Sequence, residues 1–388
     1  MRLPPAQTIS TGFVVAMVGF FSSFPVVLQG LAAMGASPAQ QASGLMAAAL
    51  AMGLAAIVLS LWSRQPVSVA WSTPGVALLA VSQAPEAGFA GAIGAFLLAG
   101  ALTVIAGLWK PLTRLINTIP VPLAQAMLAG VLLSLCLKPF QALAEAPMLS
   151  VPIILTWFLV GLVNRILAVP AAVLVTAIVV AAQAGFDLPA PDQIVAPLDW
   201  VAPRFHVTDL LSIGLPLFIV TMATQNIPGL AILRSYGYAP RAGGAVASVG
   251  AASLLSAPFG APATCLAAIT AAMCANDDSH PDPAQRYWSA ICGGVFYCVL
   301  GLLAGAITAY AGLTPPLVLG TVAGVALLGV FANSTMAALQ DPGYRQAAAI
   351  TFLVTASGIS IIGLGAAVWG LIIGGLAQWL STRLSRPG

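Results

Sequence analysis

The chain consists almost entirely of apolar segments, each about as long as a membrane-spanning helix, joined by short connections. A helix needs about 20 apolar residues to cross the hydrocarbon core of a bilayer. Hydrophobic residues make up 60% of the chain and charged residues only 6%, whereas roughly a quarter of a soluble domain is charged. So few charges cannot cover the surface of a water-soluble globule. The sequence therefore predicts a polytopic membrane protein and excludes a soluble enzyme and a disordered chain.

The apolar segments predict an all-α protein of about fourteen spans. They cover residues 10–31, 39–62, 66–83, 88–108, 120–137, 148–164, 167–184, 208–230, 241–257, 258–275, 286–310, 314–333, 345–361 and 363–382. The longest polar connection, residues 185–207, is expected outside the membrane and separates residues 1–184 from residues 208–388. Halves of about seven spans each must enter the membrane from opposite faces, which favours a 7+7 inverted repeat. Gly30-Leu31-Ala32 and Gly229-Leu230-Ala231, each in the first span of its half, support this repeat.

The basic residues indicate the orientation. With a cytoplasmic N-terminus and alternating crossings, all of the 13 lysines and arginines fall in inside segments except Lys138 and Arg204, which fall outside. Positive charges concentrate on the cytoplasmic side of membrane proteins. We therefore expect a multi-pass protein of the cell inner membrane with both termini in the cytoplasm.

The third span of the first half is predicted to be interrupted. Pro66 blocks continuation of the preceding helix, and apolar and small residues alternate over residues 67–71 as in a strand. Ser72 or Thr73 is a natural N-cap, and Pro74 suits the first turn of a helix. The helix that follows reaches only to about residue 82, which is roughly 13 Å and half a membrane.

The corresponding stretch of the second half, residues 257–264, is predicted to be interrupted in the same way. Pro258 breaks the chain, a short extended piece follows, and Pro262 is expected to open a helix. Two extended pieces at membrane depth can pair with each other, and we expect the two helix N-termini to meet near the midplane as an anion site. The alternative is a pair of proline-kinked helices without a site.

Three stretches resemble the BenE family of benzoate/proton symporters: QPVSVAWSTPG at residues 65–75, NTIPVP at 117–122 and APFGAP at 257–262. The likeness runs over nearly the whole chain, and the family is similar in fold to uracil permease and the SLC26 anion transporters. The resemblance implies fourteen spans in two inverted repeats. It implies a core domain, approximately residues 10–108 plus 208–310, that moves like an elevator against a gate domain, approximately residues 110–184 plus 314–384. Substrate would lie between spans 3 and 10, near spans 1 and 8.

The resemblance places Gln225 where uracil permease-like proteins hold substrate with an acidic residue. An amide can donate to a carboxylate, whereas a carboxylate would repel it. The candidate substrate-binding residues are Gln29, Ser72, Thr73, Pro74, Gly75, Gln225, Asn226, Pro262, Ala263 and Thr264. A candidate apolar slot for an aromatic ring consists of Phe24, Trp71 and Phe259. The alternative for the amides is that they tie helices together.

No acidic residue falls clearly inside a predicted span, and Asp209, at the start of span 8, is the nearest candidate for proton coupling. A proton carried by the substrate and the absence of coupling are the open alternatives. No metal site and no cofactor are expected. The expected partners are a small carboxylate, the proton and the lipid bilayer, with a homodimer by analogy and no nucleic acid.

Three rival functions fit parts of the sequence. Residues 276–282 resemble the Asp-rich magnesium–diphosphate motif of membrane prenyltransferases, although no second such motif is present. A channel, or a transporter of another small anion or a nucleobase, would fit the same fold. Nucleobase recognition usually uses acidic groups, which the predicted site lacks. The paired interruptions and the family resemblance favour a proton-driven importer of an aromatic carboxylate, benzoate above all.

Overall fold

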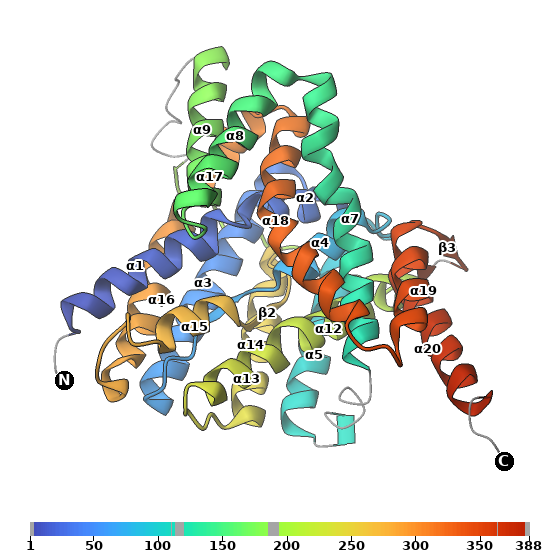
Figure 1. Cartoon of the computed structure of the whole chain (residues 1–388). Coiled ribbons are helices and arrows are strands. Elements are labelled where there is room, and N and C mark those ends of the chain that lie inside the picture. Colours follow the sequence, from blue (N-terminus) through green and yellow to red (C-terminus); the bar gives the residue numbers. More distant parts are fainter. Residues whose placement is uncertain (1–3, 110, 113–119, 185–193, 363, 385–388) are drawn as a thin grey trace.

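The computed structural model describes residues 4–109, 111–112, 120–184, 194–362 and 364–384 (Figure 1). Residues 117–119 of the second resemblance stretch and residues 185–193 of the predicted external connection lie outside the described residues. The part that is described is mostly helical, with two short strand pairs. This agrees with an all-α membrane protein that carries short extended pieces.

The first half of the chain contains eight described helices and one strand. Their bounds are α1 Ala6–Phe21, α2 Phe24–Ala33, α3 Pro38–Ser63, β1 Val69–Trp71, α4 Thr73–Val81, α5 Phe89–Leu108, α7 Val121–Glu145, α8 Pro147–Val163 and α9 Ala168–Ala184. The first predicted span is thus two helices, separated at Ser22 and Ser23.

The second half begins with a span made of five short helical pieces. These are α11 Val207–Asp209, the π-helix η1 Leu210–Gly214, α12 Leu215–Thr221, the π-helix η2 Met222–Asn226 and α13 Ile227–Ser235. The remaining elements are α14 Ala242–Ser256, η3 Ala257–Phe259, β2 Thr264–Leu266, α15 Ile269–Ala275, η4 Pro283–Gln285, α16 Tyr287–Leu302, α17 Ala304–Leu313, α18 Pro316–Leu339, α19 Arg345–Ala356, β3 Ser360–Ile361, β4 Leu364–Gly365 and α20 Ala366–Leu384.

Among the described residues, seven helical segments are long and apolar enough to cross a membrane, and an eighth is the pair η4–α16 and α17, bent by 56°. The seven segments are Ala6–Ala33, Pro38–Ser63, Phe89–Leu108, Val121–Glu145, Val207–Ser235, Ala242–Phe259 and Pro316–Leu339. Two shorter apolar helices, α8 and α9, accompany them. The chain is therefore a multi-pass membrane protein.

The strands β1 and β2 form an antiparallel pair near the centre of the molecule (Figure 1). Val69, Ala70 and Trp71 lie opposite Leu266, Cys265 and Thr264. The pair is extended at each end, because Ser72 N–H donates to Ala263 O at 2.8 Å and Ala267 N–H donates to Ser68 O at 3.1 Å. Backbone groups away from water need such partners, so the two halves of the chain satisfy each other's extended pieces.

One expectation about the second interruption was wrong. Pro262 does not open a helix: residues 261–263 are extended, strand β2 follows, and α15 begins only at Ile269. The register places the start of α4 beside Ala263 and the start of α15 beyond Ala267, at opposite ends of the strand pair. The helix N-termini therefore flank the strand pair from either side instead of meeting.

Two helix pairs cross at glycines. A Cβ on Gly53 of α3 would lie 2.5 Å from the carbonyl oxygen of Gly294 in α16, and one on Gly294 would lie 2.6 Å from the Gly53 oxygen. Helices α5 and α14 cross in the same way, because a Cβ on Gly107 would lie 2.6 Å from the Gly243 oxygen, and the reverse distance is 2.5 Å. Small residues at such crossings let membrane helices pack backbone to backbone.

The replacement Gly53→Val is expected to lower the melting temperature of the purified protein in detergent. The new side chain meets backbone atoms that cannot rotate away, and overpacking of this kind costs about 1–3 kcal/mol. The matched control is Gly329→Val in α18, where a Cβ would have no other atom within 4 Å. Equal melting temperatures of the two variants in a thermal-unfolding assay would contradict the tight crossing.

Lys138 does not lie in an external connection as predicted. It lies inside α7, which continues through Pro139 to Glu145. The proline ring is accommodated by α18, because a Cβ on Gly324 would lie 2.4 Å from Pro139 Cδ. One of the two basic residues that depart from the inside pattern is therefore part of a helix long and apolar enough to cross the membrane.

Candidate functional site

The first turn of α4 begins directly at the end of β1. Ser72 is the N-cap: its Oγ accepts from Gly75 N–H at 3.1 Å and also accepts from Thr221 Oγ1–H of α12 at 2.8 Å. Of the two caps that the sequence allowed, Ser72 fills the position and Thr73 is the first helical residue. The cap thus fixes α4 to the first span of the second half.

Thr73 carries the free donors of this helix end. Pro74 has no N–H, and the N–H groups of Ser72, Gly75 and Val76 are all bonded. The N–H and hydroxyl of Thr73 have no hydrogen-bond partner among the described residues, and its side chain is half-buried. At the positive end of the α4 dipole, only Thr73 therefore has donors available for a ligand, and this arrangement suits a small anion.

The π-helix η2 carries Gln225 and Asn226 and packs against β2 and α7, while α12, directly before it, packs against α4. In each π-helix a backbone N–H donates five residues back, Leu215 to Leu210 and Ile227 to Met222. A proline follows within two residues, at 216 and 228, and its missing N–H disturbs the regular helical ladder. Such π-bulges occur frequently at functional sites.

Asn226 and Gln225 have different environments. Asn226 is fully buried, its Oδ1 accepts from Leu266 N–H at 2.8 Å, and its Nδ2 contacts Met222 Sδ at 3.2 Å. Asn226 therefore accepts from a backbone N–H of β2 that does not face β1, which agrees with the alternative that the amides hold segments of the fold together. Gln225 is half-buried and its amide bonds to no described residue. It lies one turn after Thr221, the partner of Ser72, so it is the free amide of the pair.

Thr264 opens β2 and is buried on all sides. Its backbone N–H donates to Ser253 Oγ of α14 at 2.8 Å, whereas its side-chain Oγ1 has no partner among the described residues. The neighbouring Pro262 and Ala263 are buried, and the Ala263 carbonyl oxygen accepts a hydrogen bond from Ser72 N–H. Thr264 Oγ1 is thus the polar group of β2 that is left unsatisfied beside the α4 N-terminus.

Gln29 of α2 also has an unsatisfied group. Its Nε2 is buried without a partner among the described residues, while its Oε1 accepts from Lys138 Nζ of α7 at 3.5 Å. The adjacent Gly30 packs against α4, since a Cβ there would lie 2.7 Å from the carbonyl oxygen of Val76. Sequence reasoning missed Lys138, because the proline after it is a typical helix end.

The three aromatic slot candidates are not brought together. Trp71 is buried, donates from Nε1 to Ser23 Oγ at 2.8 Å, and lies edge-on to Phe20 with ring centroids 5.3 Å apart. Phe24 also stacks on Phe20, with ring centroids 5.9 Å apart. Phe259 instead packs against Trp200, at 5.4 Å. Phe24 and Trp71 therefore belong to one aromatic cluster, and Phe259 lies apart from it.

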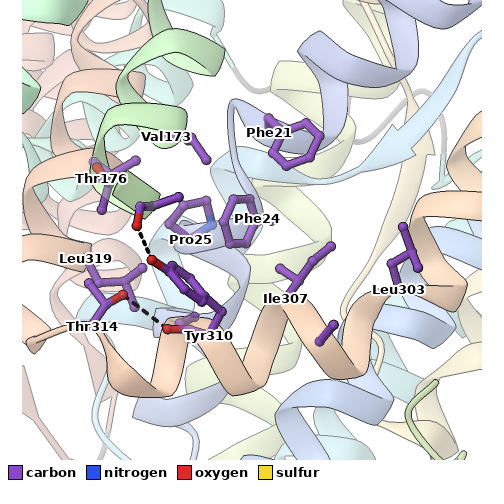
Figure 2. Close-up of a pocket in the computed structure, with 14 residues that line it drawn as sticks. Phe21, Phe24, Pro25, Val173, Thr176, Leu303, Ile307, Tyr310, Thr314 and Leu319 are labelled. Carbon is purple, nitrogen blue, oxygen red and sulfur yellow. Dashed lines mark hydrogen bonds between the residues drawn. The ribbon is translucent and has the colours of Figure 1, made fainter. Parts of the chain in front are cut away.

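Phe24 also lines an apolar cavity of about 310 Å³ between α2, α9, α17 and α18 (Figure 2). The wall includes Phe21, Phe24, Pro25, Ile307, Tyr310 and Leu319. Its few polar groups are largely occupied, because the Tyr310 hydroxyl donates to the Ala177 carbonyl and Thr314 Oγ1 donates to Tyr310 O. Such a cavity suits an apolar ring better than a charge.

Asp209 is buried and holds a backbone connection. Its Oδ1 accepts from Glu86 N–H at 2.9 Å and its Oδ2 from Ala87 N–H at 3.3 Å, in the turn that precedes α5. Both carboxylate oxygens are therefore occupied by the protein.

The Asp-rich stretch at residues 276–282 encloses Arg286. The guanidinium donates to Ala275 O and His280 O, each at 2.7 Å, and pairs with Asp277. The loop thus surrounds an internal cation that pairs with Asp277, while Asp282 caps the turn that begins at Pro283.

Two interrupted spans, paired through their strands and bordered by unsatisfied donors, are typical of the binding regions of secondary transporters. The described part of the chain has this arrangement inside an apolar multi-pass fold, and the protein is a membrane transporter of a small molecule. The family described as "BenE: Benzoate membrane transport protein" matches residues 3–380, and the chain belongs to that family.

Comparisons with known proteins agree with this class. The chain is 38% identical over 374 residues to the Inner membrane protein YdcO of Escherichia coli, covering 96% of this chain and 95% of that protein. It is 32% identical over 374 residues to the Benzoate membrane transport protein of Acinetobacter baylyi, covering 95% and 93%. These likenesses support the inner membrane as its location and a transporter rather than an enzyme.

Solved structures share the fold. The transmembrane domain of the cyanobacterial bicarbonate transporter BicA matches with a TM-score of 0.63 at 18% identity, covering 97% of this chain and 98% of that one. SLC26A9 matches with a TM-score of 0.62 at 12% identity, covering 96% and 65%. The expected SLC26-like fold is confirmed.

Proposed function

We propose that this protein is a secondary active transporter that imports an aromatic carboxylate, benzoate, together with protons. The observation that carries the proposal is the set of free donors beside the two interrupted spans: Gln29 Nε2, the N–H and hydroxyl of Thr73, the Gln225 amide and Thr264 Oγ1. No acidic side chain is hydrogen-bonded to them among the described residues. Neutral N–H and O–H donors with no acidic side chain bonded to them favour an anion, and the name of the Acinetobacter relative supports benzoate.

The proposal includes fourteen spans arranged as two inverted repeats, residues 1–184 and 208–388, joined by an external connection. The two glycine crossings support it. An inverted repeat of seven-span halves relates span 2 to span 9 and span 4 to span 11. Helix α3 is span 2 and α16 is span 11, whereas α14 is span 9 and α5 is span 4. The repeat therefore relates the crossing of α3 with α16 to the crossing of α14 with α5. In both crossings a Cβ added to either glycine would lie 2.5 or 2.6 Å from the carbonyl oxygen of the other, so the two crossings are equally close.

The same proposal divides the chain into a core domain, about residues 10–108 plus 208–310, and a gate domain, about residues 110–184 plus 314–384, with both termini in the cytoplasm. The core would move against the gate like an elevator and carry the strand pair with it. Helix contacts support the division, because α7 packs against α18 and α19, and α3 packs against α14 and α16. A homodimer is the assembly that related folds suggest.

Proton coupling is also part of the proposal. Asp209, the acid considered from the sequence, is engaged with two backbone N–H groups, so we infer that the proton travels with the substrate. A carboxylate that binds as the anion and takes up a proton before its release needs no buried acidic relay.

The test is uptake of labelled benzoate into proteoliposomes with and without an inside-alkaline pH gradient. Protein-dependent accumulation is expected only with the gradient. Protein-free liposomes are the essential control, because neutral benzoic acid crosses lipid unaided. Uptake equal to that control removes the substrate assignment. Protein-dependent uptake of labelled bicarbonate or uracil, without protein-dependent uptake of benzoate, would instead support the alternative of another anion or a nucleobase.

A further inference from the structure

Lys138 is an isolated cation inside a membrane helix. It is half-buried in α7, and no acidic side chain of the described residues pairs with it. Its stem lies against α18, where a Cβ on Gly320 would come within 2.9 Å of Lys138 Cδ. A charged residue within a membrane span is costly and usually serves function. The described part of the structure gives this charge no counter-ion of its own.

The group beside Lys138 is also incomplete. Lys138 Nζ donates to Gln29 Oε1 at 3.5 Å, and this contact leaves Gln29 Nε2 buried without an acceptor among the described residues. An ammonium has three donors and an amide nitrogen two. The pair therefore presents several N–H donors and one positive charge with only one acceptor between them. A single carboxylate, with two oxygens and one negative charge, is the complementary ligand.

The apolar cavity is lined by residues that are close in sequence to the contacts of the pair, although neither Gln29 nor Lys138 lines it. Pro25, in the wall of the apolar cavity, precedes Gln29 by four residues on α2. Leu319, in the same wall, precedes Gly320, on which the Lys138 stem packs. A ligand that has a carboxylate at one end and an aromatic ring at the other fits both features.

We propose that Lys138 is the charged group that binds the carboxylate of the transported substrate, with Gln29 Nε2 as its neighbour and the cavity around Phe24 and Pro25 receiving the ring. This inference rests on the proposed function and adds to it the residue that selects a monoanion. Because Gln29 is in α2 and Lys138 in α7, the contact joins elements assigned to the core and the gate. Substrate binding then competes directly with a contact between the two domains.

The test is ligand-induced thermal stabilisation and equilibrium binding of the full-length protein in detergent, with benzoate, bicarbonate and neutral benzamide as probes. Lys138→Met is expected to weaken benzoate binding roughly tenfold to hundredfold, the range for loss of a charge-assisted hydrogen bond, and to change benzamide binding little. Lys138→Arg should retain part of the affinity, since it keeps the charge. The control Arg383→Met removes an exposed charge on α20.

Ligand-free stability separates binding from a structural role. Lys138→Met removes an unpaired charge at nearly constant volume, so its ligand-free melting temperature should equal or exceed that of the wild type. A lower melting temperature with unchanged benzoate affinity overturns the inference. Leu319→Trp, which fills the cavity, should weaken benzoate binding but not bicarbonate binding, and equal weakening of both contradicts the place assigned to the ring.

Binding to the wild-type protein distinguishes a failure of the proposed function from a failure of the Lys138 inference. If benzoate binds the wild type and Lys138→Met equally, the inference fails and the proposed function stands. If benzoate does not bind the wild type, but bicarbonate does so in a Lys138-dependent manner, the substrate is wrong and the anion contact stands. A wild type that neither anion stabilises overturns both.

Discussion

Replacing Gln225 by Glu is expected to weaken benzoate binding far more than replacing it by Ala. Gln225 is half-buried with a free amide, one turn after Thr221, which bonds the cap of α4. The Ala variant loses about one hydrogen bond, worth about 0.5–1.5 kcal/mol. The Glu variant keeps the shape but sets a negative charge near the substrate carboxylate, and two like charges about 4 Å apart repel by about 1–4 kcal/mol at the effective dielectric of a protein–water boundary. The measurement is the benzoate dissociation constant of each purified variant.

The same charge change at a distant place is the control for Gln225. Gln378 lies on α20 with its amide at the exposed Thr382, so Gln378→Glu should leave the dissociation constant unchanged. If the Glu and Ala variants of Gln225 bind benzoate equally well, the residue does not contact the carboxylate.

The second large effect is expected at the outer edge of β2. The N–H groups of Thr264 and Leu266 point away from β1 and depend on Ser253 Oγ and Asn226 Oδ1, each at 2.8 Å. Asn226→Leu or Ser253→Ala leaves one buried N–H without an acceptor, at a cost of about 1–3 kcal/mol. Both variants should unfold at lower temperature and denaturant concentration, and both should lose substrate binding because Thr264 shifts with the strand.

A serine on the same helix serves as the control. Ser248 Oγ donates only to Gly244 O within α14, so Ser248→Ala should change the melting temperature little. Melting temperatures that agree among the Ser253, Asn226 and Ser248 variants would mean that β2 does not rely on these side chains.

The breaks in spans 3 and 10 could be predicted because proline acts locally. Pro66 and Pro258 cannot continue a helix, and Ser72 followed by Pro74 has the composition of a helix start. The start of the second half-helix could not be predicted, because a proline such as Pro262 is equally compatible with extended backbone. The extended backbone is decided by two side-chain acceptors outside the stretch, Ser253 on α14 and Asn226 on η2, the second of them 40 residues from its partner Leu266.

The least predictable part of the site is Lys138. Lysine followed by proline reads locally as the end of a helix. Helix α7 continues because Gly324 of α18 leaves room for the Pro139 ring, a tertiary contact between residues far apart in the sequence. Likewise, both Gln225 and Asn226 were candidates from the sequence, and only the position of β2 shows that Asn226 is occupied.

The pairing of β1 with β2 has a consequence for biogenesis. Val69–Trp71 leave the ribosome long before Thr264–Leu266, so the first half must wait in the bilayer with an incomplete strand. Insertases or lipid-facing chaperones have to shield that segment during synthesis, because open strand edges are not tolerated in hydrocarbon. A nascent chain stopped before residue 264 should therefore be a preferred target of membrane proteases, and release from that surveillance should coincide with translation of the second half.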